Sequence, residues 1–205
     1  KITRKTKAVA VVDYAGLPVD IFSFKKIATK HNLALIEDAA HSLGASYKGK
    51  KVGSMADMTM FSFHPVKSVT TGEGGIIVTN DKKKYEKLIL FRSNGIIKDS
   101  KKLFKKGREA WYHEMHDLGF NFRLTDIQAA LGVSQMNKLN RFIEKRKEIA
   151  RRYHQELCGL KHFILPKEIP GRKSSWHLYV VLINPELANA RDFVFGELRK
   201  SCIGV

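Results

Sequence analysis

Two short apolar runs, separated by a helical segment, most constrain how this chain can fold. Residues 7–12 and 33–36 are rich in aliphatic and β-branched side chains, which is typical of buried strands. Between them, Asp20 is predicted to be the N-cap of a helix that continues to Lys30 with its apolar positions on one face. Strand, helix and strand in this order form a βαβ unit, which implies a parallel sheet with a right-handed crossover. The chain is therefore predicted to be an α/β protein.

The rest of the chain continues with further strands and helices. Apolar β-branched runs predict the strands, polar residues before periodic apolar segments predict helix starts, and glycine or proline marks the breaks. We expect these elements in chain order: a loop or short hairpin over 44–56, a strand over 58–63, a glycine turn over 72–75, a strand over 76–79, a helix from Asp81 to about Arg92, a long irregular loop over 93–118, a helical pattern from about Thr125 past Arg151, a strand over 176–183 and a helix over 191–200.

The chain is strongly basic, with 37 lysines and arginines against 20 aspartates and glutamates and a net charge of +17. Such a balance is compatible with nucleic-acid binding. However, the excess is mostly lysine in short scattered clusters, and no zinc-finger, basic-zipper or RNA-recognition signature accompanies it. We expect solvated faces with some attraction to phosphorylated ligands, and no nucleic-acid partner.

Cysteine usage and hydropathy bear on the compartment. Cys158 and Cys202 form neither a disulfide framework nor a zinc-ligand pattern. We expect two ordinary, partly buried thiols, no metal site and a cytoplasmic protein. The sequence has no apolar run of about 18 residues, so we expect no membrane span.

Polar side chains follow two strands of the predicted sheet. Asp38 comes directly after the strand at 33–36, and Ser62 and His64 end the next strand along the chain, with Lys67 in the loop that follows. In open parallel sheets, ligands bind at the carboxyl ends of the strands. The sequence therefore predicts a carboxylate, a hydroxyl and an amine around one crevice.

This set of groups suits pyridoxal phosphate (PLP). An amine can hold the cofactor as a Schiff base, and a loop lysine can swing away when substrate replaces it. A carboxylate beside the pyridine nitrogen keeps that nitrogen protonated, so that the ring can accept electrons. A hydroxyl and backbone N–H groups suit the phosphate. The glycines over 72–75 allow the backbone to pass close to the lysine loop.

Each of these residues also has an ordinary structural interpretation. Asp38 can be a cap or turn residue, Ser62 and Lys67 can be loop surface, and His64 before Pro65 can be a satisfied loop histidine. Their joint arrangement is what favours a cofactor site.

Three segments resemble the DegT/DnrJ/EryC1/StrS sugar aminotransferases, a branch of the PLP-dependent enzymes of fold type I. Residues 37–45 (Glu-Asp-Ala-Ala-His-Ser-Leu-Gly-Ala) resemble the aspartate motif of that family. Residues 61–75, which begin Phe-Ser-Phe-His-Pro-Val-Lys, resemble its highly specific lysine motif. Residues 119–132, which begin Gly-Phe-Asn-Phe-Arg, resemble its third signature. The similarity covers nearly the whole chain, from about Thr6 to Val205.

The resemblance implies roles for five residues. Lys67 would be the Schiff-base lysine and then the base and acid that move the proton, and Asp38 would pair with the protonated ring nitrogen. His41 would lie beside the ring and its phenolic oxygen, where the family often has Gln or His. Ser62 would bind the cofactor phosphate, and Asn121 would reach that phosphate from the partner subunit. For Asn121, a helix-entry cap is the alternative.

The resemblance also implies the architecture. The fold would be that of PLP-dependent transferases of fold type I, with a large domain built on a mostly parallel sheet with helices on both faces, plus part of a small α+β C-terminal domain. We expect residues 1–135 to be part of the large PLP-binding domain, and 136–205 to hold a linking helix and part of the small domain. Such enzymes are usually homodimers with an active site shared between subunits.

Two segments most resemble the pseudaminic-acid branch of the family. These are residues 64–67 and residues 111–115, Trp-Tyr-His-Glu-Met. Members of that branch transfer the amino group of glutamate to C4 of a UDP-linked 4-keto-6-deoxy-N-acetyl sugar, so the resemblance implies glutamate and a UDP-linked keto sugar as substrates. Trp111 and Tyr112 can stack on the sugar or uracil, with simple loop packing as the alternative.

Members of the family are considerably longer than this chain. Their upstream part supplies a helix N-terminus for the phosphate and an aromatic ring that stacks on the cofactor, and their downstream part completes the small domain. We therefore expect a fragment with exposed strand edges and apolar faces, which alone binds PLP weakly or not at all.

Two further functions remain as alternatives. A truncated, catalytically inactive structural or assembly subunit would explain the shortened chain, but the intact set of Asp38, Ser62 and Lys67 argues against it. A PLP-dependent sugar dehydratase would carry histidine in place of Lys67, so the lysine argues against that function as well.

Overall fold

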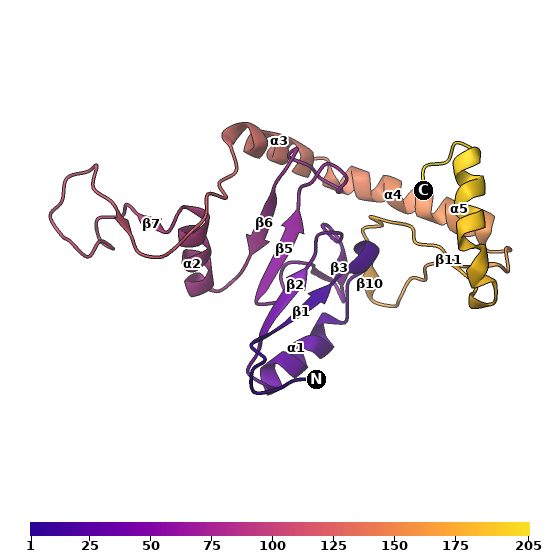
Figure 1. Ribbon diagram of the computed structural model, residues 1–205, viewed down its shortest axis with the longest axis horizontal. Coiled ribbons are helices and arrows are strands. Elements are labelled where there is room, and N and C mark those ends of the chain that lie inside the picture. Colours follow the sequence, from indigo (N-terminus) through magenta and orange to yellow (C-terminus); the bar gives the residue numbers. More distant parts are fainter.

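A four-stranded sheet forms the centre of the molecule (Figure 1). Its order is β1-β2-β5-β6, where β1 (Ala8–Val12), β2 (Ala34–Asp38) and β5 (Met58–Ser62) are parallel. β6 (Gly75–Val78) is antiparallel to β5. The predicted βαβ unit and the mostly parallel sheet are confirmed.

The other elements surround this sheet. The computed structural model describes residues 1–205, apart from the side chains at positions 188 and 189. In chain order the remaining elements are η1 (Tyr14–Gly16), α1 (Ile21–Lys30), β3 (Ser46–Tyr47), β4 (Lys50–Lys51), α2 (Lys82–Arg92), β7 (Ile96–Ile97), β8 (Glu114–Met115), α3 (Asp126–Met136), α4 (Leu139–Leu157), β9 (Phe163–Ile164), β10 (Arg172–Lys173), β11 (Leu182–Ile183), η2 (Pro185–Ala190) and α5 (Arg191–Lys200).

Helix α1 covers one face of the sheet. Alternate strand residues point to this face, and Val11 and Leu35 pack there against Ile21 of α1 in a cluster of buried side chains. On the opposite face, Val12 and Met60 remain 52% and 39% exposed. The sheet is therefore closed on one side and open on the other within this chain.

Aspartates begin α1 and α2, as the sequence predicts. The side chain of Asp20 accepts a hydrogen bond from the backbone N–H of Ser23, and Asp81 accepts from the N–H groups of Lys83 and Lys84. These bonds satisfy backbone donors that have no partner within the first turn of a helix. The short hairpin allowed over 44–56 is also present, as β3 paired with β4.

The helical pattern expected from Thr125 past Arg151 is present, but it contains a break that the sequence did not predict. The segment forms two helices, α3 and α4, interrupted at Asn137 and Lys138. Leu139, the first residue of α4, packs against the buried Val69 of the lysine loop. Because the apolar pattern continues through the break, periodicity alone did not reveal it. In Figure 1 the two helices run across the end of the sheet to which β5 points.

The strand expected over 176–183 is also wrong. Only β11, at its end, pairs with another strand, antiparallel to β9. Trp176 has φ 50°, a left-handed conformation outside the strand region. The start of this segment hydrogen-bonds to η1 instead, where Leu178 N–H donates to the carbonyl of Ala15 at 3.2 Å.

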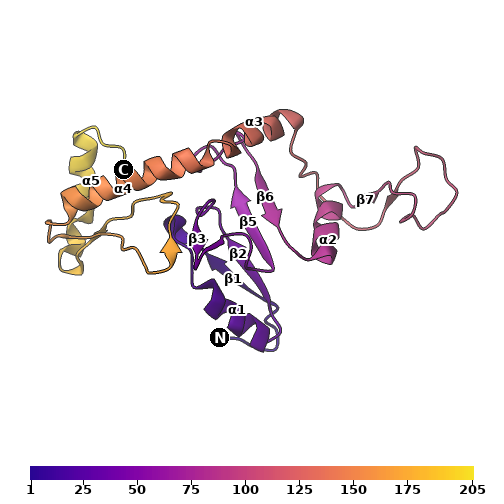
Figure 2. The same ribbon diagram turned by 180° about the vertical axis from the view of Figure 1, so that it is seen from behind.

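An extended arm leaves the body between β7 and β8, and both views show it projecting away from the sheet (Figures 1 and 2). Its two strands form a short antiparallel pair, and the residues between them are irregular, as expected for this loop. At its base, Gly95 has φ +70°, and a Cβ placed there would overlap the backbone oxygen of Asp117. The two backbones can approach this closely only because position 95 has no side chain.

Gly95→Ala is expected to lower the free energy of unfolding by about 2–4 kcal/mol, because the methyl group adds a backbone overlap to left-handed strain. Urea denaturation measures the loss. Gly107→Ala is the matched control, since Gly107 has φ +67° with nothing within 4 Å of its Cβ position. Equal losses in the two variants would contradict the steric explanation.

Both cysteines lie outside the core. Cys158 and Cys202 are both exposed, so the expectation of partly buried thiols is wrong. Cys158 directly follows α4, and Cys202 lies just beyond α5, where neither is covered by the core. Among the described residues, no helix has the length and apolar character needed to cross a bilayer.

Candidate active site

Asp38 and Ser62 lie on the same face of the sheet, at the carboxyl ends of neighbouring strands. Asp38 is opposite Met60 of β5. Ser62 comes two residues after Met60, so its side chain points to the same face. On its other side, Asp38 is opposite Val12 of β1. This is the open face, so the carboxylate and the hydroxyl are accessible and lie next to exposed apolar side chains.

Lys67 lies in a loop that is fixed at both ends. Its backbone N–H donates to the carbonyl of His64 at 3.0 Å. Val69 is 1% exposed and packs against Leu139 of α4, so the chain just beyond the lysine is anchored in the interior. The side chain of Lys67 is half-buried, and within the described part of the chain its Nζ has no hydrogen-bond or ion-pair partner.

His41 lies within the electrostatic reach of both groups. Burial lowers the pKa of His41, the charge of Lys67 lowers it further, and the charge of Asp38 acts in the opposite direction. Nδ1 of His41 accepts the backbone N–H of Ala15 at 3.3 Å. In the neutral ring the proton therefore lies on Nε2. The structure thus brings Asp38, His41 and Lys67 together at one edge of the sheet.

Two buried carboxyl groups, those of Asp13 and Glu37, lie behind this edge, and neither was predicted from the sequence as a site residue. Asp13 accepts the backbone N–H of Val19 at 2.9 Å and the hydroxyl of Ser42 at 2.7 Å. Glu37 accepts the hydroxyl of Thr59 at 2.9 Å. Both carboxyls are 0% exposed, and burial raises the pKa of each against the opposing effect of these hydrogen bonds. The available signal was the same as for Asp38, an acidic residue at the end of an apolar strand.

The raised pKa of Glu37 predicts a pH-dependent stability. A carboxyl that holds its proton more tightly when folded favours the native state most below its ordinary pKa of 4.5, and that contribution is lost as the pH rises through the raised value. Glu37→Gln is therefore expected to gain stability relative to the natural protein as the pH rises from 4.5. Urea midpoints measured across this range test it, with the exposed Glu156→Gln as the control. A difference that does not vary with pH would contradict the prediction.

Asn121 makes no hydrogen bond to the other predicted site residues within the described part of the chain. It is exposed and forms an isolated β-bridge with Ser93. The alternative that it caps a helix is wrong, because Thr125 is the N-cap of α3 and forms a capping box with Gln128. A contact between Asn121 and the cofactor phosphate stays a prediction.

The groups around His41 fit a flat, phosphorylated cofactor. One oxygen of Asp38, Oδ1, accepts the N–H of Ala40 at 3.1 Å, while Oδ2 has no hydrogen-bond partner among the described residues. Ser62 Oγ accepts the N–H of His64 at 3.3 Å, which leaves its own proton available to a ligand. A free amine, a free carboxylate oxygen and a free hydroxyl proton next to apolar surface match the groups of PLP. In the described part of the chain, no group of three or more His, Cys, Asp or Glu residues is placed to hold a metal ion.

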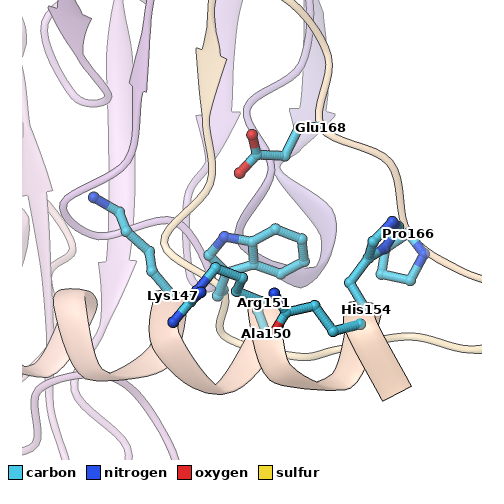
Figure 3. A pocket seen from close by; sticks show the side chains of 8 residues that line it. Lys147, Ala150, Arg151, His154, Pro166 and Glu168 are labelled. Carbon is cyan, nitrogen blue, oxygen red and sulfur yellow. The ribbon is translucent and has the colours of Figure 1, made fainter. Parts of the chain in front are cut away.

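A pocket of about 480 Å³ lies apart from these residues, between α4 and the segment that follows β9 (Figure 3). The residues that line it are Lys147, Ala150, Arg151, His154, Gln155, Pro166, Glu168 and Trp176. The next residue along the chain, His177, contacts the ring of His41 instead, with 4.5 Å between the ring centroids. Trp176 therefore faces the pocket, and its neighbour His177 faces the candidate active site.

The sequence profile of the DegT/DnrJ/EryC1/StrS aminotransferase family matches residues 1–205. The chain belongs to this family. The resemblance found in the three motifs is thereby confirmed, and with it the fold class of PLP-dependent aminotransferases.

Individual relatives agree with this assignment. A UDP-4-amino-4,6-dideoxy-N-acetyl-beta-L-altrosamine transaminase from Campylobacter jejuni is 43% identical over 198 residues, which are 97% of this chain and 50% of that protein. A protein of the same name from Helicobacter pylori is 40% identical over 199 residues, 97% of this chain and 51% of that protein. The chain therefore spans about half the length of the curated relatives it matches.

Solved structures give the same result. The structure of Helicobacter pylori PseC, an aminotransferase involved in the biosynthesis of pseudoaminic acid, superimposes with a TM-score of 0.90 at 38% identity and covers 98% of this chain and 52% of that chain. A putative sugar aminotransferase from Streptococcus pneumoniae, in its PMP form, superimposes with a TM-score of 0.89 at 28% identity over 99% of this chain and 56% of that chain. Structures of the latter protein in PLP and PMP forms indicate that pyridoxal phosphate is the cofactor of the family.

Proposed function

We propose that this chain carries the cofactor centre of a cytoplasmic nucleotide-sugar aminotransferase, which moves the amino group of glutamate to C4 of a UDP-linked 4-keto-6-deoxy-N-acetyl sugar. The observation that carries the proposal is the grouping of an unpartnered amine, that of Lys67, and an unpartnered carboxylate oxygen, that of Asp38, around His41. The two transaminases at 40% and 43% identity support the choice of substrates.

Each of these side chains has a definite task in amino transfer. Pyridoxal phosphate, when bound, supplies an electron-accepting ring and the carbon that carries the amino group. Lys67 would hold the cofactor covalently through its amine and, once freed by the amino donor, would act as the base and acid that move the proton. The free oxygen of Asp38 would keep the ring nitrogen protonated, and the hydroxyl of Ser62 would donate its proton to the phosphate.

His41 completes the set as a hydrogen-bond donor. Its Nδ1 is occupied by the Ala15 N–H, so the ring of a neutral His41 presents its N–H from Nε2. A phenolic oxygen beside the cofactor ring is a suitable acceptor for that proton. A neutral donor suits this position because it orients the oxygen without adding a second cation beside Lys67.

The proposed enzyme is a homodimer. Residues around Asn121 expose large apolar side chains, with Phe122 71% and Ile127 84% exposed, which supports a protein partner on this surface. In the proposed homodimer, Asn121 reaches the phosphate site of the partner copy. Residues 1–135 form the PLP-binding part and 136–205 the linking helix and part of the small domain.

The test is a coupled assay for 2-oxoglutarate release from glutamate with UDP-linked 4-keto-6-deoxy-N-acetyl sugars. The expected result is turnover with the keto sugar and none with the same sugar reduced to the 4-hydroxy form, since the hydroxyl cannot accept an amino group. A protein that binds PLP yet turns over none of these keto sugars would contradict the proposed substrate. A structural or assembly subunit would show the same lack of turnover without taking up PLP.

A further inference from the structure

The segment that begins at Ser175 is fastened to η1 and to His41. The backbone N–H of Ser175 donates to the carbonyl of Gly16 at 3.0 Å, and its hydroxyl donates to the carbonyl of His41 at 2.9 Å. Leu178 N–H donates to the carbonyl of Ala15 at 3.2 Å. Three hydrogen bonds thus join this segment to η1 and to the backbone of His41, which are far from it in sequence.

Helix α4 holds the same segment from its other side. The guanidinium of Arg146 donates through one nitrogen to the carbonyls of Trp176 and His177, at 3.3 and 3.1 Å. These bonds fix the backbone at the two residues where the chain turns from the pocket of Figure 3 toward the candidate active site. The position of His177 is therefore set by contacts on two sides.

Backbone strain is concentrated where these parts meet. Ala15 and Trp176 have φ values of 58° and 50°, and such left-handed conformations are unfavourable for residues with side chains. Gly16 has φ +99°, and a Cβ there would lie 2.6 Å from Ser175 Oγ and 2.9 Å from the nitrogen of His177. Strained residues of this kind persist where the surrounding contacts hold them, and they are frequent at functional sites.

These contacts pack the imidazole of His177 against that of His41. The rings of His41 and His177 lie 4.5 Å apart between centroids, with an angle of 43° between their planes. His177 is 9% exposed, and its Nδ1 is buried without a hydrogen-bond partner among the described residues. Tyr14 also lies near His41, at 6.1 Å between ring centroids. Two aromatic side chains therefore lie close to the ring of His41, and His177 is the nearer of them.

Burial and nearby positive charges lower the pKa of both rings. Burial, then the charges of His41, Lys67 and Arg146, lower the pKa of His177 to about 4. Burial and Lys67 lower the pKa of His41, and only Asp38 opposes this. At neutral pH both imidazoles are uncharged, and neither repels the cation of Lys67.

We propose that His177 is a positioning residue for His41: its ring excludes water from the imidazole of His41 and keeps it neutral, with Nδ1 bonded to Ala15 and the N–H of Nε2 directed away from that bond. The use of this N–H by a cofactor rests on the function proposed above. The positioning itself does not, because all of its contacts are made by the protein alone.

The test is NMR titration of the His41 ring in the cofactor-free protein, with ¹⁵N shifts of the imidazole nitrogens to report the tautomer. In the natural protein, His41 is expected to carry its proton on Nε2 and to titrate below 6.5. In His177→Ala, water reaches the ring, so the midpoint is expected to rise toward that value and the two tautomers to mix. In His177→Phe, which keeps an uncharged ring against His41, both quantities are expected to stay as in the natural protein.

The comparison between these variants separates positioning from a general effect on folding. The His154→Ala control removes an exposed histidine of α4 and is expected to leave the His41 titration unchanged. An unaltered midpoint and tautomer in a folded His177→Ala protein would overturn the proposal. If the alanine variant does not fold, a changed tautomer in His177→Phe would overturn it instead. Because no cofactor is present, these results are independent of any failure of the aminotransferase assay.

Discussion

Lys67→Ala is expected to abolish amino transfer together with the absorption band of protein-bound PLP. Loss of the proton-transferring amine alone costs about 10²–10⁴-fold in rate, and loss of the covalent attachment adds to it. The coupled assay gives the rate, and a spectrum of the PLP-loaded protein gives the band. We expect activity in this variant to fall below detection while urea denaturation stays close to that of the natural protein, since Nζ has no protein partner within the described residues.

Lys67→Arg is the informative companion. The guanidinium keeps the positive charge that lowers the pKa of His41, but it cannot form a Schiff base with the cofactor. Activity is expected to be lost as in the alanine variant, while the His41 titration is expected to stay low. Activity retained in either variant would show that another group performs the covalent chemistry.

Asp38→Asn is expected to lower kcat by a factor on the order of 10²–10³, the size typical of losing one preorganised electrostatic partner. Asparagine has nearly the same shape, and its carbonyl can still accept the N–H of Ala40 that Oδ1 now receives. What it lacks is the negative charge that keeps the ring nitrogen protonated. The covalent attachment at Lys67 is expected to survive, so this variant separates cofactor capture from turnover.

Steady-state kinetics measures the effect of Asp38→Asn, with a borohydride-trapped adduct as evidence that the cofactor is bound. The surface substitution Asp192→Asn is the control, because the Asp192 side chain is 88% exposed and pairs only with its neighbour Arg191 in the described structure. A kcat within twofold of the natural protein in Asp38→Asn would remove Asp38 from the role proposed for it.

Local sequence signals predicted most of the central sheet and its helix starts. Short stretches of sequence predict the βαβ unit, the N-caps at Asp20 and Asp81 and the irregular loop after α2, because each of these depends on residues a few positions apart. The motif residues Asp38, His41 and Lys67 came together for the same reason. They follow two strands that pair directly in the sheet.

The errors lie where contacts between distant parts of the chain decide the conformation. The break before Leu139 accompanies packing on Val69, and the irregular path at Trp176 is held by Arg146 and η1. No local pattern contains those contacts. His177 was missed for this reason, since a lone histidine in an expected strand carries no signal until the fold brings it to His41.

The expectation that the chain alone binds PLP weakly or not at all stays a prediction. Weak binding implies that an excess of cofactor is needed for complete labelling of Lys67. Weak binding lowers the affinity for PLP but does not change which lysine reacts.

The most direct measurement is borohydride reduction of the protein with PLP at substoichiometric concentration, followed by peptide mapping of the pyridoxyl group by mass spectrometry. The account predicts a single labelled lysine, Lys67, with the label absent from Lys67→Ala. Labelling spread over the many surface lysines, or concentrated on a different one, would contradict the assignment of the cofactor centre.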